Sequence, residues 1–173
     1  IDGLALSQFF ISFAYLAFLI KNSDQSMLFY LILLLVFINI FFNFSLFKKI
    51  KFFLGNSGSM LLGIILAFFS IYLYEYEKIH PSYVIWSLYL YVFEFFAVSI
   101  IRIKNKKSLF DGGNDHVHHL LFLIFNKSHL LTTIFLFFCS LLIMIFSYFL
   151  NKHFPNYISI FLFITTFLIY LKI

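Results

Sequence analysis

Three histidines lie close together in the segment DHVHHLL, at positions 116, 118 and 119. Neutral imidazoles bind metal ions, whereas protonated imidazoles bind phosphate and transfer protons near neutral pH. The three lack the wider spacing and fourth ligand of a structural zinc site, and the single cysteine, Cys139, lies inside an apolar run. The basic segment 102–107 just upstream favours a polyanion or metal–phosphate site. The alternative is a histidine cluster at a membrane interface that simply tolerates water.

Two acidic residues are candidates because of where they stand. Glu94 lies inside an apolar stretch, where a carboxyl group is costly and by default indicates a functional site. Its alternative role is a protonated or snorkelling side chain that hydrogen-bonds a neighbouring helix. Asp2 stands just before the first apolar run, where an acidic residue serves either as a helix N-cap or as a ligand.

The segment FFLGNSGSMLLG is rich in glycine and serine. Gly55 and Gly58 allow sharp turns of the backbone, and Ser57 and Ser59 offer hydroxyl groups where a helix begins. The free amides of a helix N-terminus suit an anion. Close helix packing is the competing interpretation, because Ser59 and Gly63 form a small-xxx-small pair.

The elements that position these residues must be apolar. The chain has 173 residues, of which 63% are hydrophobic and 11% charged, and its mean hydropathy is +1.01. Six runs, most near the ~20 residues that cross a bilayer core, cover residues 4–20, 27–47, 54–74, 83–101, 129–150 and 157–171. They do not alternate as barrel strands would. The sequence predicts an all-α fold, a polytopic membrane helical bundle with about six transmembrane helices in a single membrane domain, residues 1–173.

Basic residues lie at the ends of these runs and predict the orientation. Alternating the runs across a membrane places nine on one side: Lys48, Lys49, Lys51, Arg102, Lys104, Lys106, Lys107, Lys127 and Lys172. Only Lys21, Lys78 and Lys152 fall on the other side. The positive-inside rule makes the first side cytoplasmic, where the IDG, glycine-rich and histidine segments all lie. Orientation therefore explains the net charge of +5 better than nucleic-acid binding does.

Three motifs, in order and on the same side, resemble one enzyme family. FFLGNSGSMLLG resembles the FLGD(A/S)GS…LG segment of the polyprenyl-phosphate N-acetylhexosamine-1-phosphate transferases. RIKNKKSLFDGGNDHVHHLL resembles the same family's basic loop, which runs through Ser-Pro-Phe to His-x-His-His, and IDGLA looks like the tail of its Asn-x-x-Asp-Gly segment. The match spans essentially the whole chain, and the branch most similar to it transfers GlcNAc-1-phosphate.

The resemblance implies a multi-pass enzyme of the bacterial inner (cytoplasmic) membrane. Such an enzyme transfers a sugar-1-phosphate from a UDP-N-acetylhexosamine to a polyprenyl (undecaprenyl) phosphate and releases UMP, with Mg²⁺ or Mn²⁺ as cofactor. This is the first membrane step of cell-envelope glycan synthesis. The implied partners are these two substrates and the lipid bilayer, with no nucleic acid, and a homodimer is among the assemblies that the resemblance allows.

Residue roles follow from the same resemblance. It implies catalytic roles for Asp2, His116, His118 and His119, substrate contacts for Arg102, Ser108, Asp115 and Glu94, and metal ligation by Asn56 and Asp2. Three positions depart from the family pattern. Asn56 stands where the family has a metal-binding Asp, Glu94 where relatives carry Asp, and Leu109 where they carry Pro.

The family's early Asp-Asp segment has no counterpart here. We therefore expect the chain to be the C-terminal portion of a longer transferase and to be inactive alone. Two other interpretations stay open. One is a small transporter that uses Glu94 and the histidines as a proton or anion path, and the other is a paralogue that binds lipid phosphate without catalysis, which Asn56 would permit.

Overall fold

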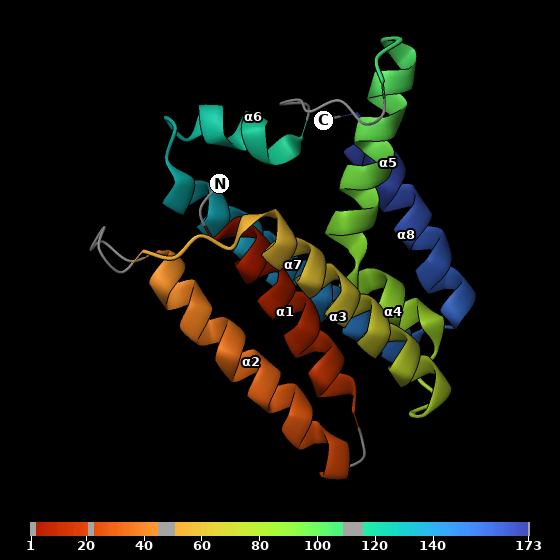
Figure 1. Ribbon diagram of the computed structural model, residues 1–173. Coiled ribbons are helices and arrows are strands. Elements are labelled where there is room, and N and C mark those ends of the chain that lie inside the picture. The colour runs from red at the N-terminus through yellow and green to blue at the C-terminus, as the bar shows by residue number, and fades with distance from the viewer. Residues whose placement is uncertain (1–2, 21–22, 45–50, 109–115, 173) are drawn as a thin grey trace.

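The computed structural model describes residues 3–20, 23–44, 51–108 and 116–172, which form eight α-helices and no strand (Figure 1). The helices are α1 (Leu4–Leu19), α2 (Ser23–Asn43), α3 (Gly55–Glu75), α4 (Pro81–Ser87), α5 (Tyr89–Lys104), α6 (Val117–Ile124), α7 (His129–His153) and α8 (Asn156–Tyr170). The predicted all-α fold is confirmed. Over its described residues, each predicted apolar run corresponds to one helix, except that residues 83–101 form the pair α4 and α5. An additional short helix, α6, begins directly after His116.

The prediction of about six transmembrane helices is met only in part. Three helices of the described chain, α2, α3 and α7, are long and apolar enough to cross a membrane, or four if the bent pair α4–α5 is one span. At a rise of ~1.5 Å per residue, the 16 residues of α1 and the 15 of α8 extend less than the ~30 Å of a hydrocarbon core. The structure therefore supports a helical, membrane-like bundle with three or four candidate spans.

Helix α1 is the centre of the first core, and it contacts α2, α3, α4 and α7. The fully buried ring of Phe13 lies 5.2 Å from Phe9, 5.0 Å from Phe29 of α2 and 5.2 Å from Phe69 of α3, measured between ring centroids. Aromatic pairs at such distances contribute about 0.5–1.5 kcal/mol each beyond the area they bury. Phenylalanine packing therefore joins α1, α2 and α3.

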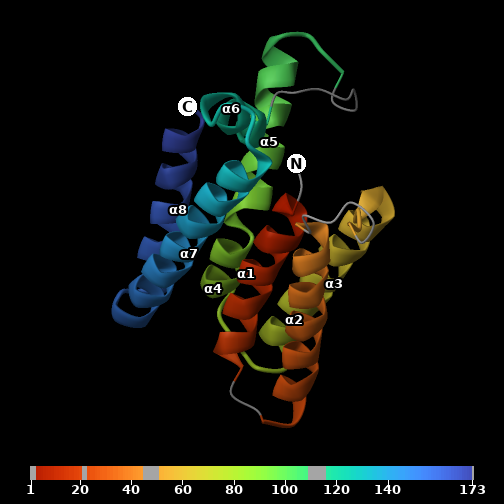
Figure 2. The ribbon, with the colours of Figure 1, turned by 90° about the vertical axis from the view of Figure 1, so that its left-hand side faces the viewer.

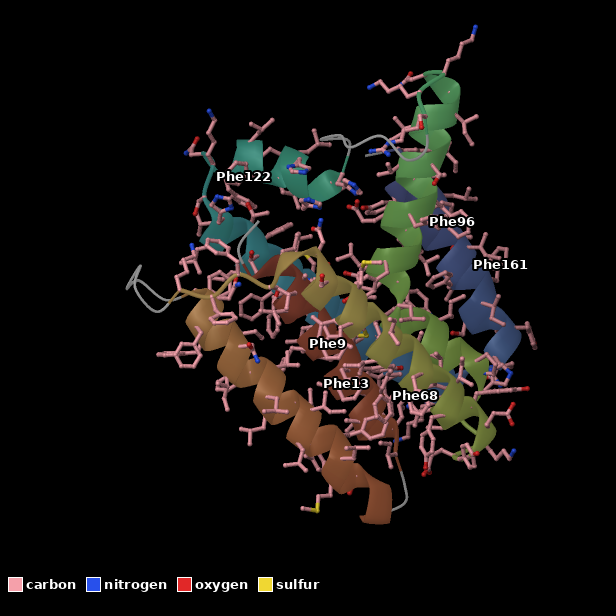
Figure 3. All side chains as sticks on the ribbon, in the orientation of Figure 1. Phe9, Phe13, Phe68, Phe96, Phe122 and Phe161 are labelled. Carbon is pink, nitrogen blue, oxygen red and sulfur yellow. The ribbon has the colours of Figure 1, made fainter. Side chains whose placement is uncertain are left out.

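The outer surface of the bundle is also rich in phenylalanine. Figure 3 shows Phe9 and Phe13 within the bundle and Phe68, Phe96 and Phe161 on its outside, where they are 62%, 49% and 65% exposed. Soluble monomers rarely leave so much contiguous apolar surface in contact with water. These side chains are placed where lipid would surround a membrane protein.

The second core joins α4, α5, α7 and α8 around a sharp bend. The chain bends by 68° between the end of α4 and the start of α5. Two hydrogen bonds hold the helices at the bend: the Trp86 indole N–H donates to Ser159 Oγ of α8 (2.9 Å), and the Tyr89 hydroxyl lies 2.8 Å from Ser140 Oγ of α7. Because α5 is redirected by this bend, Glu94 faces α8.

The predicted grouping of the three motifs at one end is visible in two views. Figures 1 and 2 show the start of α1, the start of α3, the end of α5 and helix α6 at the same end of the bundle. The described basic residues follow the predicted division, since Lys51, Arg102 and Lys127 adjoin this end whereas Lys78 and Lys152 adjoin the other. The chain topology thus gathers segments that are far apart in the sequence.

Gly55 allows a stability prediction with a matched control in the same helix. Gly55 has a φ of +66°, which disfavours any side chain, whereas Gly63 lies inside α3 with open space where a Cβ would project. We expect Gly55→Ala to lower the free energy of unfolding by about 1–2 kcal/mol. Gly63→Ala should leave it unchanged or raise it by about 0.5–1 kcal/mol. Denaturant unfolding of the chain in detergent measures both, and equal effects would contradict the left-handed start of α3.

Candidate functional site

The candidate site is built on the Glu94 carboxyl group, which is anchored in α5. Oε2 of Glu94 lies 2.7 Å from Nδ1 of His116, the residue that precedes α6. The side chain of Glu94 is 16% exposed and that of His116 is 36% exposed, so the pair is largely shielded from water. A carboxylate that accepts from Nδ1–H fixes the orientation of the ring and leaves the lone pair of Nε2 available.

The other carboxyl oxygen of Glu94 accepts two further hydrogen bonds. Oε1 accepts from the backbone N–H of Val117 at 3.1 Å and from the hydroxyl of Tyr170 at 2.8 Å. The first amides of a helix lack partners within it, so Glu94 caps the start of α6 from a different helix. Tyr170 is the last residue of α8. A single carboxyl group therefore ties together α5, α6 and α8.

The three imidazoles of the histidine segment are neighbours. The rings of His116 and His118 are stacked with centroids 5.1 Å apart, and those of His118 and His119 are 4.3 Å apart. His119 is 6.2 Å from His116. The structure thus brings together all three predicted catalytic histidines and adds Glu94 to them.

Burial favours the neutral form of two of these imidazoles, His118 and His119. Desolvation and, to a smaller extent, the neighbouring His119 lower the pKa of His118 to about 4, although the carboxylate of Glu94 acts in the opposite direction. Burial also lowers the pKa of His119, with a contribution from His116. His118 is therefore neutral near pH 7, and it offers a lone pair or an N–H group rather than a positive charge.

The remaining predicted residues lie in several places. Arg102 is buried in the last turn of α5, eight residues or about 12 Å of helix rise beyond Glu94, and Ser108 is exposed after that helix. Asn56 is exposed in the first turn of α3, where its backbone carbonyl oxygen accepts a hydrogen bond from the Ser59 hydroxyl at 2.8 Å. Asp2, Leu109 and Asp115 lie outside the described residues.

The IDG segment and the glycine-rich segment meet in a cavity of about 260 Å³. Gly3, from the IDG segment, and Gly55, from the glycine-rich segment, both line it, together with Asn43 of α2. A Cβ atom on Gly3 would collide with the ring of Phe44, so this glycine permits the close approach of α1 to the end of α2. None of the described residues that line this cavity comes from the histidine segment.

The packing interpretation of Ser59 and Gly63 is not supported within the described part of the chain. Nothing lies within 4 Å of a Cβ atom built on Gly63. Ser59 instead bonds within its own helix. Gly55 therefore permits the start of α3, and Gly63 makes no close contact with another helix among the described residues.

One group of side chains in the described chain could hold a metal ion, and it consists of Glu94, His116 and His118. Each offers one ligand atom, and these atoms all lie within 4.8 Å of one another. Mg²⁺ prefers an octahedral set of oxygen ligands. The predicted Mg²⁺ ligand Asn56 is on another helix and supplies one amide oxygen, so the described residues do not assemble an oxygen-rich magnesium site.

Sequence reasoning missed Tyr170 completely. The chain has 11 tyrosines, and a tyrosine near the end of an apolar run is ordinarily a membrane-interface residue. No local pattern distinguishes Tyr170 from the others, because its partner Glu94 lies 76 positions away. Only the packing of α5 against α8 reveals the contact.

No protein-family model, no curated protein and no solved structure matches this chain.

The Tyr170 contact yields a prediction with a control on the same helix. Tyr170→Phe removes a hydrogen bond to a partly buried carboxyl group, so we expect it to lower the free energy of unfolding by about 1.5–3 kcal/mol. Tyr157, at the other end of α8, is 71% exposed, and Tyr157→Phe should have no measurable effect. Unfolding of both variants in detergent provides the test. A Tyr170→Phe variant as stable as the parent chain would contradict the anchoring role.

Proposed function

We propose that this chain belongs to an enzyme that transfers a sugar-1-phosphate, of the N-acetylhexosamine type, from a UDP-sugar to a polyprenyl phosphate with release of UMP. The proposal combines the three-motif resemblance with the arrangement of the histidines. Its location would be the bacterial cytoplasmic membrane, with the histidine end of the bundle in the cytoplasm.

The observation that carries the proposal is the contact between Glu94 and His116. A carboxyl group that lies in an apolar helix, orients an imidazole and adjoins two further imidazoles is typical of sites that handle protons or anions. The start of α3 and the basic residues near the ends of α5 and α6 lie at the same end of the bundle. An anionic, phosphate-bearing substrate is the class of ligand that this combination suits best.

The finer topology is part of the same proposal. Six crossings require the short helices α1 and α8 to pass through the membrane. Their length is sufficient if they cross with little tilt and if the bilayer is locally thinner around them. Their contacts support this, since α1 packs against the long helices α2, α3 and α7, and α8 packs against α7. Six crossings would keep the motifs of α1, α3 and α5–α6 in one compartment.

The roles proposed for the described residues follow from their chemistry. Glu94 orients His116, and the Nε2 atom of that ring is then able to accept a proton from a substrate hydroxyl or phosphate group. The neutral ring of His118 donates a hydrogen bond to a phosphate oxygen, and an incoming phosphate dianion would raise the pKa of that ring. Arg102 supplies positive charge nearer the end of α5. A divalent metal, when bound, would neutralise charge on the transferred phosphoryl group.

His118→Ala tests the proposal in the full-length protein encoded by the gene. We expect UMP release from a UDP-N-acetylhexosamine, in the presence of polyprenyl phosphate, to fall at least about 100-fold while membrane insertion persists. The control is His153→Ala, because His153 is exposed at the opposite end of the bundle. Undiminished UMP release from the His118 variant would remove the histidines from the active site. A parent protein that releases no UMP would favour the transporter or the non-catalytic paralogue.

Asn56→Asp tests the proposed metal side of the site. The substitution adds a carboxylate at an exposed position in the first turn of α3, where negative charge also suits the helix dipole. We expect activity to be kept or raised and half-maximal UMP release to require less Mg²⁺. A titration with Mg²⁺ measures this requirement, and complete loss of activity would contradict a position beside the metal.

A further inference from the structure

The donor set of Glu94, His116 and His118 does not suit the magnesium ion that the resemblance implies. It comprises one carboxylate oxygen and two imidazole nitrogens, with ligand atoms that all lie within 4.8 Å of one another. Mg²⁺ binds imidazole poorly, whereas Zn²⁺ binds carboxylate oxygen and imidazole nitrogen together. All three side chains are partly buried, so a bound ion would be shielded from bulk water without being sealed off.

We propose that Glu94, His116 and His118 form a binding site for a transition-metal dication, with Zn²⁺ as the best-suited ion. This site is separate from the magnesium position expected at Asn56 and Asp2, and it does not depend on the proposed transferase activity. Three protein ligands leave a fourth position open to water or to an exogenous anion, which is the ligand count of reactive rather than purely structural zinc sites.

The Glu94 carboxyl group is already positioned for such a role. Oε1 is held by the backbone N–H of Val117 and by the hydroxyl of Tyr170, so Oε2 is the oxygen that faces the imidazole of His116. Outer-shell hydrogen bonds of this kind orient metal ligands and are a regular part of metal sites. Tyr170 and Val117 would therefore belong to the outer shell.

Only a small movement is needed for the ion to enter. Oε2 of Glu94 and Nδ1 of His116 are 2.7 Å apart, and two ligand atoms of a tetrahedral zinc ion are separated by about 3.4 Å, given metal–ligand distances of about 2.1 Å. In the metal-bound form the ion would take the place of the proton between them and that proton would move to Nε2 of His116, so the proton-accepting role proposed for Nε2 belongs to the metal-free form. Rotation of the side chains would provide the change. The ring of His118, which is stacked on that of His116, would also have to rotate, because an imidazole coordinates a metal in the plane of its ring.

The protonation of the neighbouring ring agrees with this geometry. Imidazole binds a metal through a neutral ring nitrogen, and burial keeps His118 neutral near pH 7. A cluster meant only to attract anions through charge would instead gain from protonated rings. The geometry and the donor types carry the proposal, and the neutral ring is consistent with it.

Cobalt binding tests the site without any sugar nucleotide. The full-length protein, purified in detergent through an affinity tag free of histidine and treated with a chelator, would be titrated with Co²⁺ at neutral pH. We expect one equivalent to bind with the intense visible absorption of four-coordinate Co²⁺, and Zn²⁺ to abolish that absorption at an equimolar amount. A large excess of Mg²⁺ should leave it unchanged.

Variants assign the ligands. We expect His118→Ala and Glu94→Gln to lower the affinity for Co²⁺ at least 100-fold, and Tyr170→Phe to lower it about 10-fold through loss of the outer-shell hydrogen bond. His129→Ala and His153→Ala are controls, since neither residue belongs to the cluster. If Glu94→Gln fails to fold, His118→Ala still decides the question. The hydrogen bonds that hold the start of α6 join Glu94 to His116 and to Val117, and they do not involve the ring of His118.

Three outcomes would overturn the proposal. They are a parent protein with no saturable binding, a spectrum of weak six-coordinate Co²⁺, and a His118→Ala variant with the affinity of the parent. Because metal binding is measured without substrate, its failure would leave the transferase proposal intact. Conversely, a protein that binds Co²⁺ as expected but releases no UMP would retain the metal site and lose the proposed activity.

Discussion

The arrangement of the candidate site depends on a single carboxyl group in an apolar helix. Glu94 lies in α5 with a side chain that is 16% exposed, and a carboxyl group in such surroundings is stable only if hydrogen-bond donors surround it. Its two oxygens receive those donors from His116, Val117 and Tyr170. This requirement brings the histidine segment and the end of α8 to α5, and it explains why α6 begins beside α5.

The bend between α4 and α5 places Glu94 where these donors can reach it. Helix α4 contacts α1, α7 and α8, whereas α5 turns by 68° and contacts α8. Hydrogen bonds from Trp86 and Tyr89 to serines of α8 and α7 hold the two sides of the bend. In an apolar environment such contacts between helices replace part of the hydrophobic driving force that soluble proteins use. The scaffold of the site is thus held by hydroxyl groups as well as by aromatic packing.

Helix α1 joins the two halves of the bundle. Its phenylalanines pack into the first core with α2 and α3. Its polar residues face α7, since the Ser140 hydroxyl donates to Gln8 Oε1 at 2.6 Å and the Ser147 hydroxyl donates to Tyr15 at 3.0 Å. Neighbouring helices cover most of α1, since ten of its 16 residues are buried. A helix surrounded in this way needs little amphipathic patterning.

The amino-acid sequence by itself determined the all-helical class, the positions of the apolar runs and the end of the bundle at which the motifs gather. These properties follow from local hydrophobicity and from alternation along the chain, which need no knowledge of contacts. It also singled out Glu94, because an ionisable residue in an apolar run is conspicuous, and the histidines, because they are adjacent.

Tertiary structure alone decided which residues meet. Glu94 contacts His116, which is 22 positions away in the sequence, and Tyr170, which is 76 positions away. No periodic pattern in the sequence predicts either contact. The 68° bend lies at a sequence without proline or glycine, so no local pattern indicates it, and the sequence predicts residues 83–101 as one continuous span. Gly63 fits a packing motif but faces open space, because a motif specifies only that close approach is permitted. Hydrophobicity is a property of each segment, whereas the partners of a buried polar group depend on how all the segments pack. This is why the bundle and most residues of its candidate site were predictable, whereas the contacts among those residues were not.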